Sequence, residues 1–363
     1  MPEHTHFWEE SMKRYRTRPR LFVLLCSVVF LAAACTTTPE PSAGFQPEVL
    51  PLPAEASDYA PISSYAAMEI PADNPITAEK VALGRQLFFD QRLSGDGERS
   101  CYGCHENDKG LSDGRTTALG AFDKVLSRNS PTLWNIGYHA EYYWDGRSKP
   151  LASQALAAWR GGNMGADPDE VVTELNGIEG YQDQFQAIFN EDATPENVSK
   201  ALAAYMRTII SSNTPWDRWQ AGDESAVSDS AKRGYEVFEK AECNNCHDGV
   251  LFTDLQYHNV GIGMDAEEPD LGRHKVTEED SDRGAFKTPT LRDVSQSGPY
   301  FHNGSVATLE EAVDFMLDGG QDNPFLDREN LKEVDLSDAE REDLLEFLRS
   351  LDESVELKAP PLP

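Results

Sequence analysis

The chain has 363 residues, with 63 acidic and 32 basic side chains, so its formal net charge at pH 7 is −31. This length exceeds that of one typical domain and favours two domains. The acidity excludes nucleic acid and an anionic membrane surface as partners and would steer a basic protein towards the chain, unless it serves only solubility.

Residues 1–34 are predicted to be a signal peptide. Five basic residues between Lys13 and Arg20 precede an uncharged apolar segment, residues 21–34, which is short for a membrane span. The segment leads into Leu31-Ala-Ala-Ala-Cys35, which resembles a bacterial lipobox, where the cysteine is lipidated and becomes the new N-terminus. We expect a periplasmic lipoprotein, tethered to the outer membrane through Cys35. An ordinary signal peptide with an incidental cysteine is the alternative.

Residues 35–66 contain the predicted anchor and a linker rich in Pro, Ala, Ser and Thr. The leader has a net charge of +2, so the mature chain would carry −33. Of the six cysteines, Cys26 and Cys35 belong to the leader and the anchor. The other four form two Cys-x-x-Cys-His pentads, residues 101–105 and 243–247, which leaves none for a disulfide.

The folded part shows an internal duplication. Leu83-Gly-Arg-Gln-Leu-Phe88 precedes the first pentad, and Arg233-Gly-Tyr-Glu-Val-Phe238 precedes the second. Both stretches have apolar residues at helical spacing, with Thr77 as one predicted N-cap and Ser228 or Asp229 as the other. The sequence therefore predicts two equivalent modules, each with a helix that leads into its pentad.

The pentads predict covalent haem attachment at Cys101, Cys104 and His105 and at Cys243, Cys246 and His247. Two thiols three residues apart can add to the two vinyl groups of haem, and the following histidine then reaches the iron. Zinc sites and thioredoxin-type redox pairs fit less well, because zinc needs further nearby ligands and a thioredoxin pair needs no histidine.

The predicted fold is mostly α, with two cytochrome c-like haem domains related by internal duplication, long loops and little strand. We place the N-terminal domain at residues 67–222, the C-terminal domain at 223–355 and a tail at 356–363, with the junction at 216–228. Further helices are predicted at residues 151–159, 168–175, 196–211, 309–317 and 337–351.

The chain resembles the bacterial di-haem cytochrome c peroxidase family, which includes the di-haem enzyme that matures methylamine dehydrogenase. The similarity covers about residues 75–352. It rests on five blocks in the same order as in the family: Leu83-Gly-Arg-Gln-Leu-Phe-Phe-Asp90, Arg128-Asn-Ser-Pro-Thr132, Tyr143-Trp-Asp-Gly-Arg147, Phe286-Lys-Thr-Pro-Thr-Leu-Arg292 and Pro299-Tyr-Phe-His-Asn-Gly304.

The resemblance implies a role for several residues of the C-terminal domain and of the region between the domains. His247 and Met316 would be the axial ligands of a high-potential haem; by pattern alone Met264 is an alternative to Met316. The maturation enzyme has tyrosine at the position of Met316, so methionine there favours the peroxidase branch. Trp144 would lie between the haems and shorten electron tunnelling.

The resemblance also implies a calcium ion between the domains. Asn129 and the backbone carbonyls of Ser297 and Pro299 would bind it, because calcium prefers oxygen ligands. Family members are often dimers, which makes a homodimer an expectation here as well.

The N-terminal haem site departs from the family in two places. The loop Leu119–Asn129 has Ala121 where many family members carry a histidine that blocks the distal side, so we expect an open sixth position. Asn163 replaces a glutamate that shuttles a proton, and asparagine is no general acid or base. Gln154 matches a family pocket residue. Candidates to replace the glutamate are Asp123, Arg160 and Asp167.

The remaining histidines carry weaker signals. His302 lies in the last of the five blocks that carry the resemblance, where a structural hydrogen bond is expected. His139, His258 and His274 are predicted to be surface or loop residues, and each is a minor alternative as a distal ligand.

Three functions remain open from the sequence. The first is a peroxidase that reduces hydrogen peroxide to water, with electrons from a c-type cytochrome or a cupredoxin. In it, electrons enter at the C-terminal haem and pass to the N-terminal haem. The second is a maturation-type oxidase that modifies a partner protein. The third is a non-catalytic, membrane-tethered electron carrier or peroxide sensor, which the Asn163 replacement favours.

Overall fold

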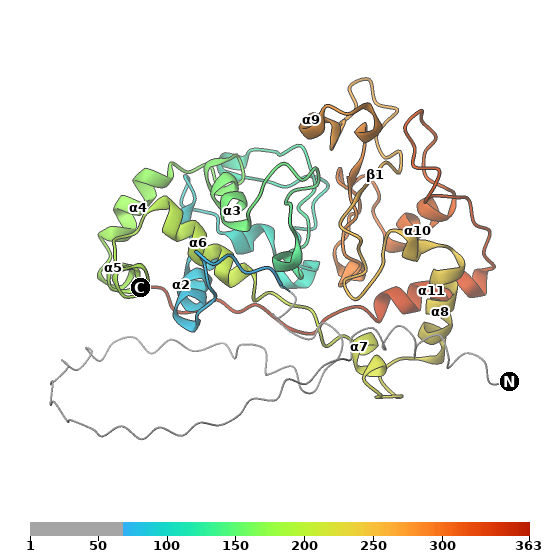
Figure 1. Cartoon of the computed structure of the whole chain (residues 1–363), viewed down its shortest axis with the longest axis horizontal. Coiled ribbons are helices and arrows are strands. Elements are labelled where there is room, and N and C mark those ends of the chain that lie inside the picture. The colour runs from blue at the N-terminus through green and yellow to red at the C-terminus, as the bar shows by residue number, and fades with distance from the viewer. Residues whose placement is uncertain (1–67) are drawn as a thin grey trace, which may run out of the picture. The chain divides into compact units, whose positions relative to one another are not determined.

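The computed structural model describes residues 68–363, which belong to one compact unit (Figure 1). The predicted leader, the anchor Cys35 and most of the linker lie outside the described residues. Within residues 68–363, none of the helices has both the length and the apolar character to cross a membrane.

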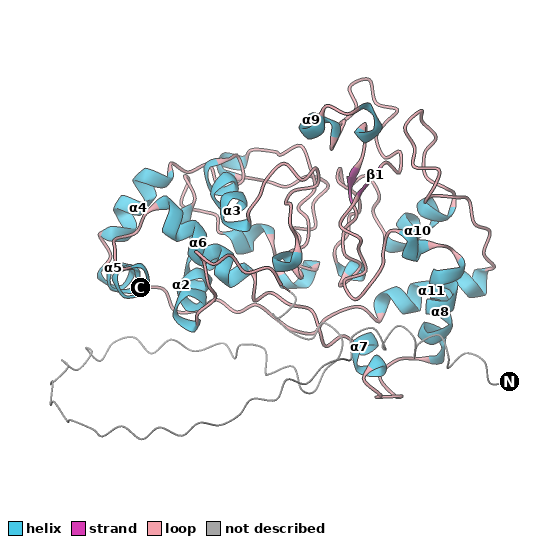
Figure 2. Cartoon of the chain, viewed as in Figure 1, coloured by secondary structure: helices cyan, strands magenta, loops and turns pink. Residues whose placement is uncertain are grey.

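The described chain is mostly helical, with long loops between the helices (Figure 2). The N-terminal half contains α2 (Ala78–Phe89), α3 (Leu151–Arg160), α4 (Pro168–Asn176), α5 (Glu179–Phe189), α6 (Pro195–Met206) and α7 (Pro215–Gln220). The C-terminal half contains α8 (Asp229–Lys240), α9 (His274–Thr277), α10 (Leu309–Leu317) and α11 (Asp338–Arg349). The strands β1 (Tyr257–His258) and β2 (Phe286–Lys287) form an antiparallel pair. This mostly α class with little strand confirms the prediction.

Eight short 3₁₀ segments punctuate the loops. They are η3 (Gln91–Leu93), η4 (Cys101–Cys104), η5 (Asn107–Lys109), η6 (Ala121–Asp123), η7 (Ile136–Tyr138), η8 (Cys243–Asn245), η9 (Asp280–Asp282) and η10 (Val294–Gln296) among the described residues. Two of them begin at the first cysteine of a pentad: η4 contains both Cys101 and Cys104, and η8 contains Cys243 and is followed directly by Cys246.

The duplication recurs in the helix packing. α2 packs on α6, and α8 packs on α11. A Cβ atom at Gly84 would lie 2.0 Å from the carbonyl oxygen of Ala201, and one at Gly234 would lie 1.9 Å from that of Asp343. Each helix pair therefore crosses at a point where only glycine fits, which explains why glycine occupies the same place in both copies.

Two hydrophobic cores match the two halves. One contains Leu87 and Phe88 of α2 with Tyr205 of α6, and the other contains Phe238 of α8 with Phe347 of α11. Since each core includes the helix that precedes a pentad, each pentad is fixed to a separate packed unit.

The predicted caps and helices agree with the structure in part. The side chains of Thr77 and Ser228 accept N–H groups of the first turns of α2 and α8, so Ser228, and not Asp229, is the N-cap of α8. The helix expected over residues 196–211 ends at Met206. The sequence prediction missed α5, and it also missed α7, which lies partly inside the segment assigned to the junction.

The end of the chain returns to the N-terminal half. Residues 352–363, the C-terminal strap, follow α11 and contact α2 and the loop after the first pentad. Arg85 donates to the carbonyl oxygen of Lys358 at 2.8 Å. The side-chain amide of Asn107 donates to the Leu357 carbonyl at 2.9 Å and accepts the Leu357 N–H at 2.8 Å. These bonds join the two halves independently of the pentads.

Candidate functional site

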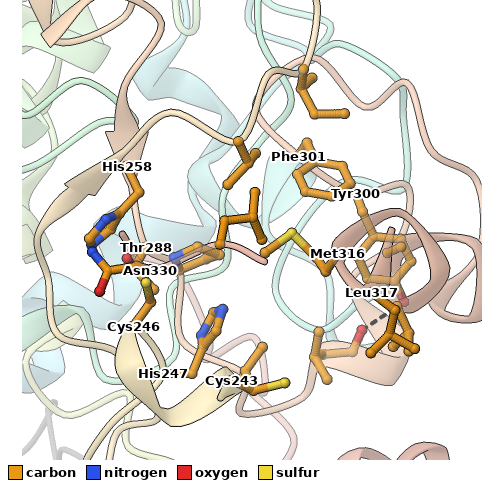
Figure 3. Close-up of a pocket in the computed structure, with 18 of the residues that line it drawn as sticks. Cys243, Cys246, His247, His258, Thr288, Tyr300, Phe301, Met316, Leu317 and Asn330 are labelled. Atoms are coloured by element: carbon orange, nitrogen blue, oxygen red, sulfur yellow. Dashed lines mark hydrogen bonds between the residues drawn. The ribbon is translucent and has the colours of Figure 1, made fainter. Parts of the chain in front are cut away.

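The second pentad lies on a cavity of the C-terminal half (Figure 3). Cys243, Cys246 and His247 all line this cavity. The Nδ1 atom of His247 lies 3.0 Å from the carbonyl oxygen of Phe252, to which it can only donate. With the proton held on Nδ1, the lone pair of Nε2 is free for a metal. Burial lowers the pKa of His247, which also keeps the ring neutral.

Met316 reaches the same cavity from the last turn of α10. The helix starts at a capping box in which Thr308 accepts the N–H of Glu311 and the Glu311 carboxylate accepts the N–H of Thr308. Figure 3 shows the Met316 thioether and the His247 ring directed into the same space. Met264 does not line the cavity, so of the two candidates the structure brings only Met316 to His247. Its role as axial ligand stays a prediction.

The walls of this cavity suit a large apolar group. Phe238, Ile262, Leu291, Val313 and Leu344 are among the lining side chains. Apolar walls, paired thiols, a neutral imidazole and a thioether together match what a covalently bound haem requires. Burial raises the pKa of the Cys243 thiol to about 12. This is the opposite of the activated thiolate of a thioredoxin-type pair.

The first pentad repeats the local geometry of the second. His105 donates from Nδ1 to the carbonyl oxygen of Leu111 at 2.9 Å, the counterpart of the His247–Phe252 bond. Ser130 holds the loop by donating to the carbonyl oxygen of Cys104 at 2.9 Å. Burial lowers the pKa of His105 and raises that of the Cys101 thiol to about 12. This site therefore also offers a neutral imidazole whose Nε2 can bind a metal.

The loop near the first pentad brings together the two positions that depart from the family. The buried Ala121 donates its N–H to the carbonyl oxygen of Asn163 at 3.0 Å. The carbonyl of Leu119, at the start of the same loop, lies 3.9 Å from the thiol of Cys104. Ala121 and Asn163, which stand where many family members have a histidine and a glutamate, are thus neighbours close to the first pentad.

Gln154 lies on α3, half-buried, and its side chain is hydrogen-bonded to Tyr143. Tyr143 has a left-handed backbone (φ +66°), and the Arg147 guanidinium lies 3.6 Å from its ring centroid. Burial raises the pKa of this phenol. Tyr143 could not be singled out from the sequence, because aromatic residues in such a block are commonly packing residues.

The three candidates to replace the family glutamate face solvent. Asp123 is exposed and pairs with Arg99 at 3.0 Å. Asp167 is exposed and caps α4 by accepting the N–H of Asp169, and Arg160 is exposed at the end of α3. None of the three contacts Asn163 through a described hydrogen bond.

Trp144 connects the two halves. Its indole N–H donates to the carbonyl oxygen of Asn129 at 2.9 Å, while its own carbonyl accepts the N–H of Lys287 in β2 at 2.8 Å. The side chain also lines the C-terminal cavity. A residue of the N-terminal half therefore forms part of the wall around the second pentad, although its role in electron transfer stays a prediction.

The predicted calcium ligands are partly together. The Asn129 side-chain amide is buried and lies 3.3 Å from the carbonyl oxygen of Pro299 and 2.8 Å from that of Arg115. Ser297 hydrogen-bonds with its hydroxyl to the carbonyl of Val294. A flip of the Asn129 amide would direct its oxygen towards these carbonyls, as a cation requires. The calcium site stays a prediction.

The other histidines have defined environments. His302 is buried, stacks on Phe286 with ring centroids 3.5 Å apart, and lines the C-terminal cavity. Burial lowers its pKa to about 4. His139 lies in a loop, as one of the two predicted settings, but its Nε2 is buried and its Nδ1 lies 3.2 Å from Nζ of Lys287. His274 is half-buried, begins the short helix α9 and bonds through Nδ1 to the Glu279 carbonyl at 2.8 Å.

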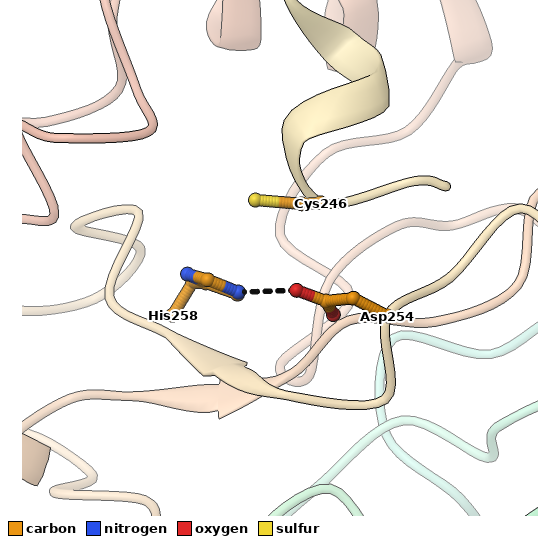
Figure 4. A group of neighbouring side chains, drawn as sticks. All are labelled: Cys246, Asp254 and His258. Carbon is orange, nitrogen blue, oxygen red and sulfur yellow. Dashed lines mark hydrogen bonds and ion pairs between the residues drawn. The ribbon is translucent and has the colours of Figure 1, made fainter. Parts of the chain in front are cut away.

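His258 forms a cluster with Cys246 and Asp254 that resembles a metal site (Figure 4). One ligand atom of each residue lies within 4.8 Å of the others. However, both ring nitrogens of His258 already bond to carboxylates, Nδ1 to Asp327 at 2.6 Å and Nε2 to Asp254 at 3.0 Å. Hydrogen bonds to Cys246, Asp327 and Asp254 raise its pKa to about 10, against the effect of burial. A protonated ring has no lone pair for a metal, so His258 is unsuited to be a distal ligand.

Comparison with known proteins assigns both halves. The family model of di-haem cytochrome c peroxidase matches residues 78–225, and that of cytochrome c matches residues 231–352. These matches confirm the predicted pair of cytochrome c-like domains.

Several known proteins are similar over most of the chain. Methylamine utilization protein MauG of Methylorubrum extorquens is 40% identical over 300 residues, 81% of this chain and 84% of that protein. Cytochrome-c peroxidase IdrP1 of Denitromonas iodatirespirans is 37% identical over 326 residues, 81% of this chain and 86% of that protein. The crystal structure of a MauG-like protein associated with microbial copper homeostasis matches with a TM-score of 0.73 at 31% identity, covering 81% of this chain and 95% of that one.

Proposed function

The chain belongs to the di-haem cytochrome c peroxidase family, and on that basis we propose that it reduces hydrogen peroxide to water. Membership implies two covalently bound haem c groups and an oxidoreductase activity. In our proposal, electrons from a small redox protein, a c-type cytochrome or a cupredoxin, enter the C-terminal domain. They then pass to the N-terminal domain, where peroxide is reduced.

The observation that carries this proposal is the difference between the two pentads. At the second, Met316 and His247 share one cavity, which supports a closed, electron-carrying site. At the first, Ala121 stands beside Asn163, and neither side chain is a metal ligand of the usual kind. This supports a sixth position that a small oxidant can reach.

Trp144 supports the proposed path of the electrons between the domains. It belongs to the N-terminal half, contacts Asn129 there, and lines the cavity of the C-terminal half. An aromatic ring in this position offers a path between the two sites. Its backbone bond to Lys287 fixes the segment that carries it.

The residues of the N-terminal site determine whether the reaction must take its protons from solvent. Haem supplies the redox-active iron when it is bound. Each peroxide takes up two electrons and two protons to give two water molecules. The Asn163 side chain can donate a hydrogen bond to peroxide but cannot deliver a proton, so we propose that protons arrive through water.

The proposal is tested with the purified protein carrying both haems. A reduced c-type cytochrome should be oxidised when peroxide is added, with two cytochromes consumed per peroxide. Trp144→Leu should slow electron transfer between the domains. It should leave unchanged the rate at which the donor reduces the C-terminal haem. Trp219→Leu, a tryptophan on α7 that does not line the cavity, is the matched control. No turnover with any donor while both haems are attached contradicts the proposal and leaves an electron carrier or peroxide sensor.

A second candidate is oxidation of a partner protein by the same two haem domains. It is favoured by relatives that include MauG at 40% identity and by the absence of a histidine in the 119–129 loop. Met316 argues against it, because the maturation branch has tyrosine there. A covalently altered partner that accumulates only with peroxide and this protein would support the second candidate over the first.

We also propose the surroundings in which the protein works. Calcium would be bound by Asn129 with the carbonyls of Ser297 and Pro299, between the domains. The protein would be tethered in the periplasm through Cys35. Chelation followed by a metal assay tests the first, and mass spectrometry of the mature N-terminus tests the second.

A further inference from the structure

Lys287 is a buried cation without a carboxylate partner among the described residues. Only 9% of its surface is exposed, and its ammonium group donates to the carbonyl oxygen of Glu141 at 2.6 Å. Within residues 68–363, no ion pair reaches this Nζ atom. A buried charge is costly unless an opposite charge or several hydrogen bonds compensate for it. The site therefore lacks an anion that would complete it.

His139 adds a second unused donor at the same place. Nζ of Lys287 donates to Nδ1 of His139 at 3.2 Å, so the proton of the neutral ring is on Nε2. This Nε2 is buried and has no hydrogen-bond partner. Desolvation and the charge of Lys287 hold the pKa of His139 well below its ordinary value, which keeps the ring neutral. Lys287 thus has two neutral acceptors, the Glu141 carbonyl and the His139 ring, and no anion among the described residues.

The nearby carboxylates are engaged elsewhere. Glu141 pairs with Arg273 at 3.0 Å and with Lys149 at 3.1 Å. Asp145 pairs with Arg128 at 2.7 Å and with Arg147 at 2.8 Å. Since both acids already have cationic partners, neither is available to Lys287.

The position of Lys287 indicates where the missing anion comes from. Lys287 lines the cavity of the second pentad, beside Trp144, Phe286 and Thr288. A haem c that fills this cavity carries two propionate carboxylates, and each needs a cation or donors when it leaves water.

We propose that Lys287 binds a propionate of the C-terminal haem, with its ammonium group held by the Nδ1 atom of His139, and so acts as a positioning residue for the electron-transfer site. The inference rests on the proposed function in that it requires a haem at this site, but it does not require peroxide turnover. Burial lowers the pKa of Lys287 to about 8 in the protein without an anion, and a bound carboxylate would favour the charged form. Because Lys287 also bonds to the carbonyl of Trp144, the same residue joins this haem edge to the bridge between the domains.

The experiment measures the reduction potential of each haem by spectroelectrochemical titration of the full protein with both haems attached. Loss of a cation near a haem favours the ferric form. Lys287→Gln should therefore shift the ferric/ferrous equilibrium of the Met-ligated haem about tenfold towards ferric, equivalent to about 59 mV for a one-electron couple. Lys287→Arg should largely restore the potential, and His139→Phe should shift it less, in the same direction.

Lys240→Gln is the matched control, because Lys240 is an exposed lysine of the same domain whose ion pair is with Glu340. It should leave both potentials unchanged. An unchanged potential in Lys287→Gln, or an equal shift of both haems, would overturn the inference. If Lys287→Gln fails to incorporate haem, His139→Phe decides by itself: it removes the acceptor that holds the Lys287 ammonium group, and a potential equal to that of the parent protein overturns the inference. Loss of peroxide turnover with these shifts intact would reject only the proposed function.

Discussion

The two pentads share one proximal geometry and differ in what stands around them. In both, a 3₁₀ turn begins at the first cysteine and the histidine donates from Nδ1 to a backbone carbonyl six or five residues later. At the second pentad a thioether enters the cavity, whereas at the first an alanine and an asparagine meet. Haem attachment and function are therefore separable. The duplication preserves the attachment geometry, and a few distal residues set the function of each site.

Both halves bury charged side chains, Lys80 and Arg207 among them in the N-terminal half. Near the second pentad, both ring nitrogens of His258 bond to carboxylates, and Lys287 has no carboxylate partner among the described residues. Arg292 and Asp217 of α7, both fully buried, form an ion pair at 2.8 Å. This pair fixes α7, whose Trp216 belongs to the C-terminal core, to the C-terminal half.

The largest expected effect comes from replacing the Met316 thioether. Met316→His should replace sulfur with nitrogen at the sixth position and lower the potential of the C-terminal haem by a few tenths of a volt, within the ~0.8 V that axial ligands span. Spectroelectrochemistry measures this directly. A potential that stays within error of the parent protein would show that Met316 is not the ligand.

Restoring the family glutamate should raise peroxide turnover at the N-terminal site. Asn163→Glu supplies a general acid–base, a contribution worth about 10²–10⁴-fold in rate, so peroxide turnover should rise by up to that factor. Asn163→Gln has a side chain as long as glutamate but cannot transfer a proton, so peroxide turnover should not rise. Equal rates for the two variants would place Asn163 away from the bound peroxide.

Some features of the fold and of the two sites could be predicted from the sequence, and others could not. The pentads, the caps Thr77 and Ser228, the helix of Met316 and the paired glycines Gly84 and Gly234 all follow local rules of spacing and were predictable. α5, the C-terminal strap and the Lys287–His139 contact were not, since each depends on segments far apart in the chain. A buried lysine has the same sequence signal as an exposed one, so only the fold could reveal it.

Breaking the buried ion pair should destabilise the C-terminal half selectively. Asp217→Asn leaves the Arg292 guanidinium buried without its anion, which should cost about 3–5 kcal/mol in the free energy of unfolding. Denaturant unfolding followed through each haem would show the second site lost first. The exposed Asp223→Asn on the same segment should cost less than about 0.5 kcal/mol, and equal losses would argue against the assignment.

A pH dependence of stability is also expected in the C-terminal half. Burial raises the pKa of Asp293 to about 8, and one of its carboxylate oxygens has no partner. The folded state then binds more protons than the unfolded state between about pH 4 and pH 8, so stability falls as pH rises, by at most about 1.4 kcal/mol per unit.

Asp293→Asn removes this titration and should be more stable than the parent protein at pH 8 but not at pH 4. Its left-handed backbone (φ +59°) accommodates asparagine. Unfolding curves at the two pH values measure the effect, and parallel losses in both proteins would contradict it.

The most direct test of the asymmetry is the spin state of the two haems in the protein as isolated, before any reduction. Electron paramagnetic resonance and optical spectra should show one high-spin ferric haem, at His105, and one low-spin haem with methionine ligation, at His247. Two low-spin haems would reveal a hidden ligand at the first site and contradict the account. Two high-spin haems would remove Met316 from the second.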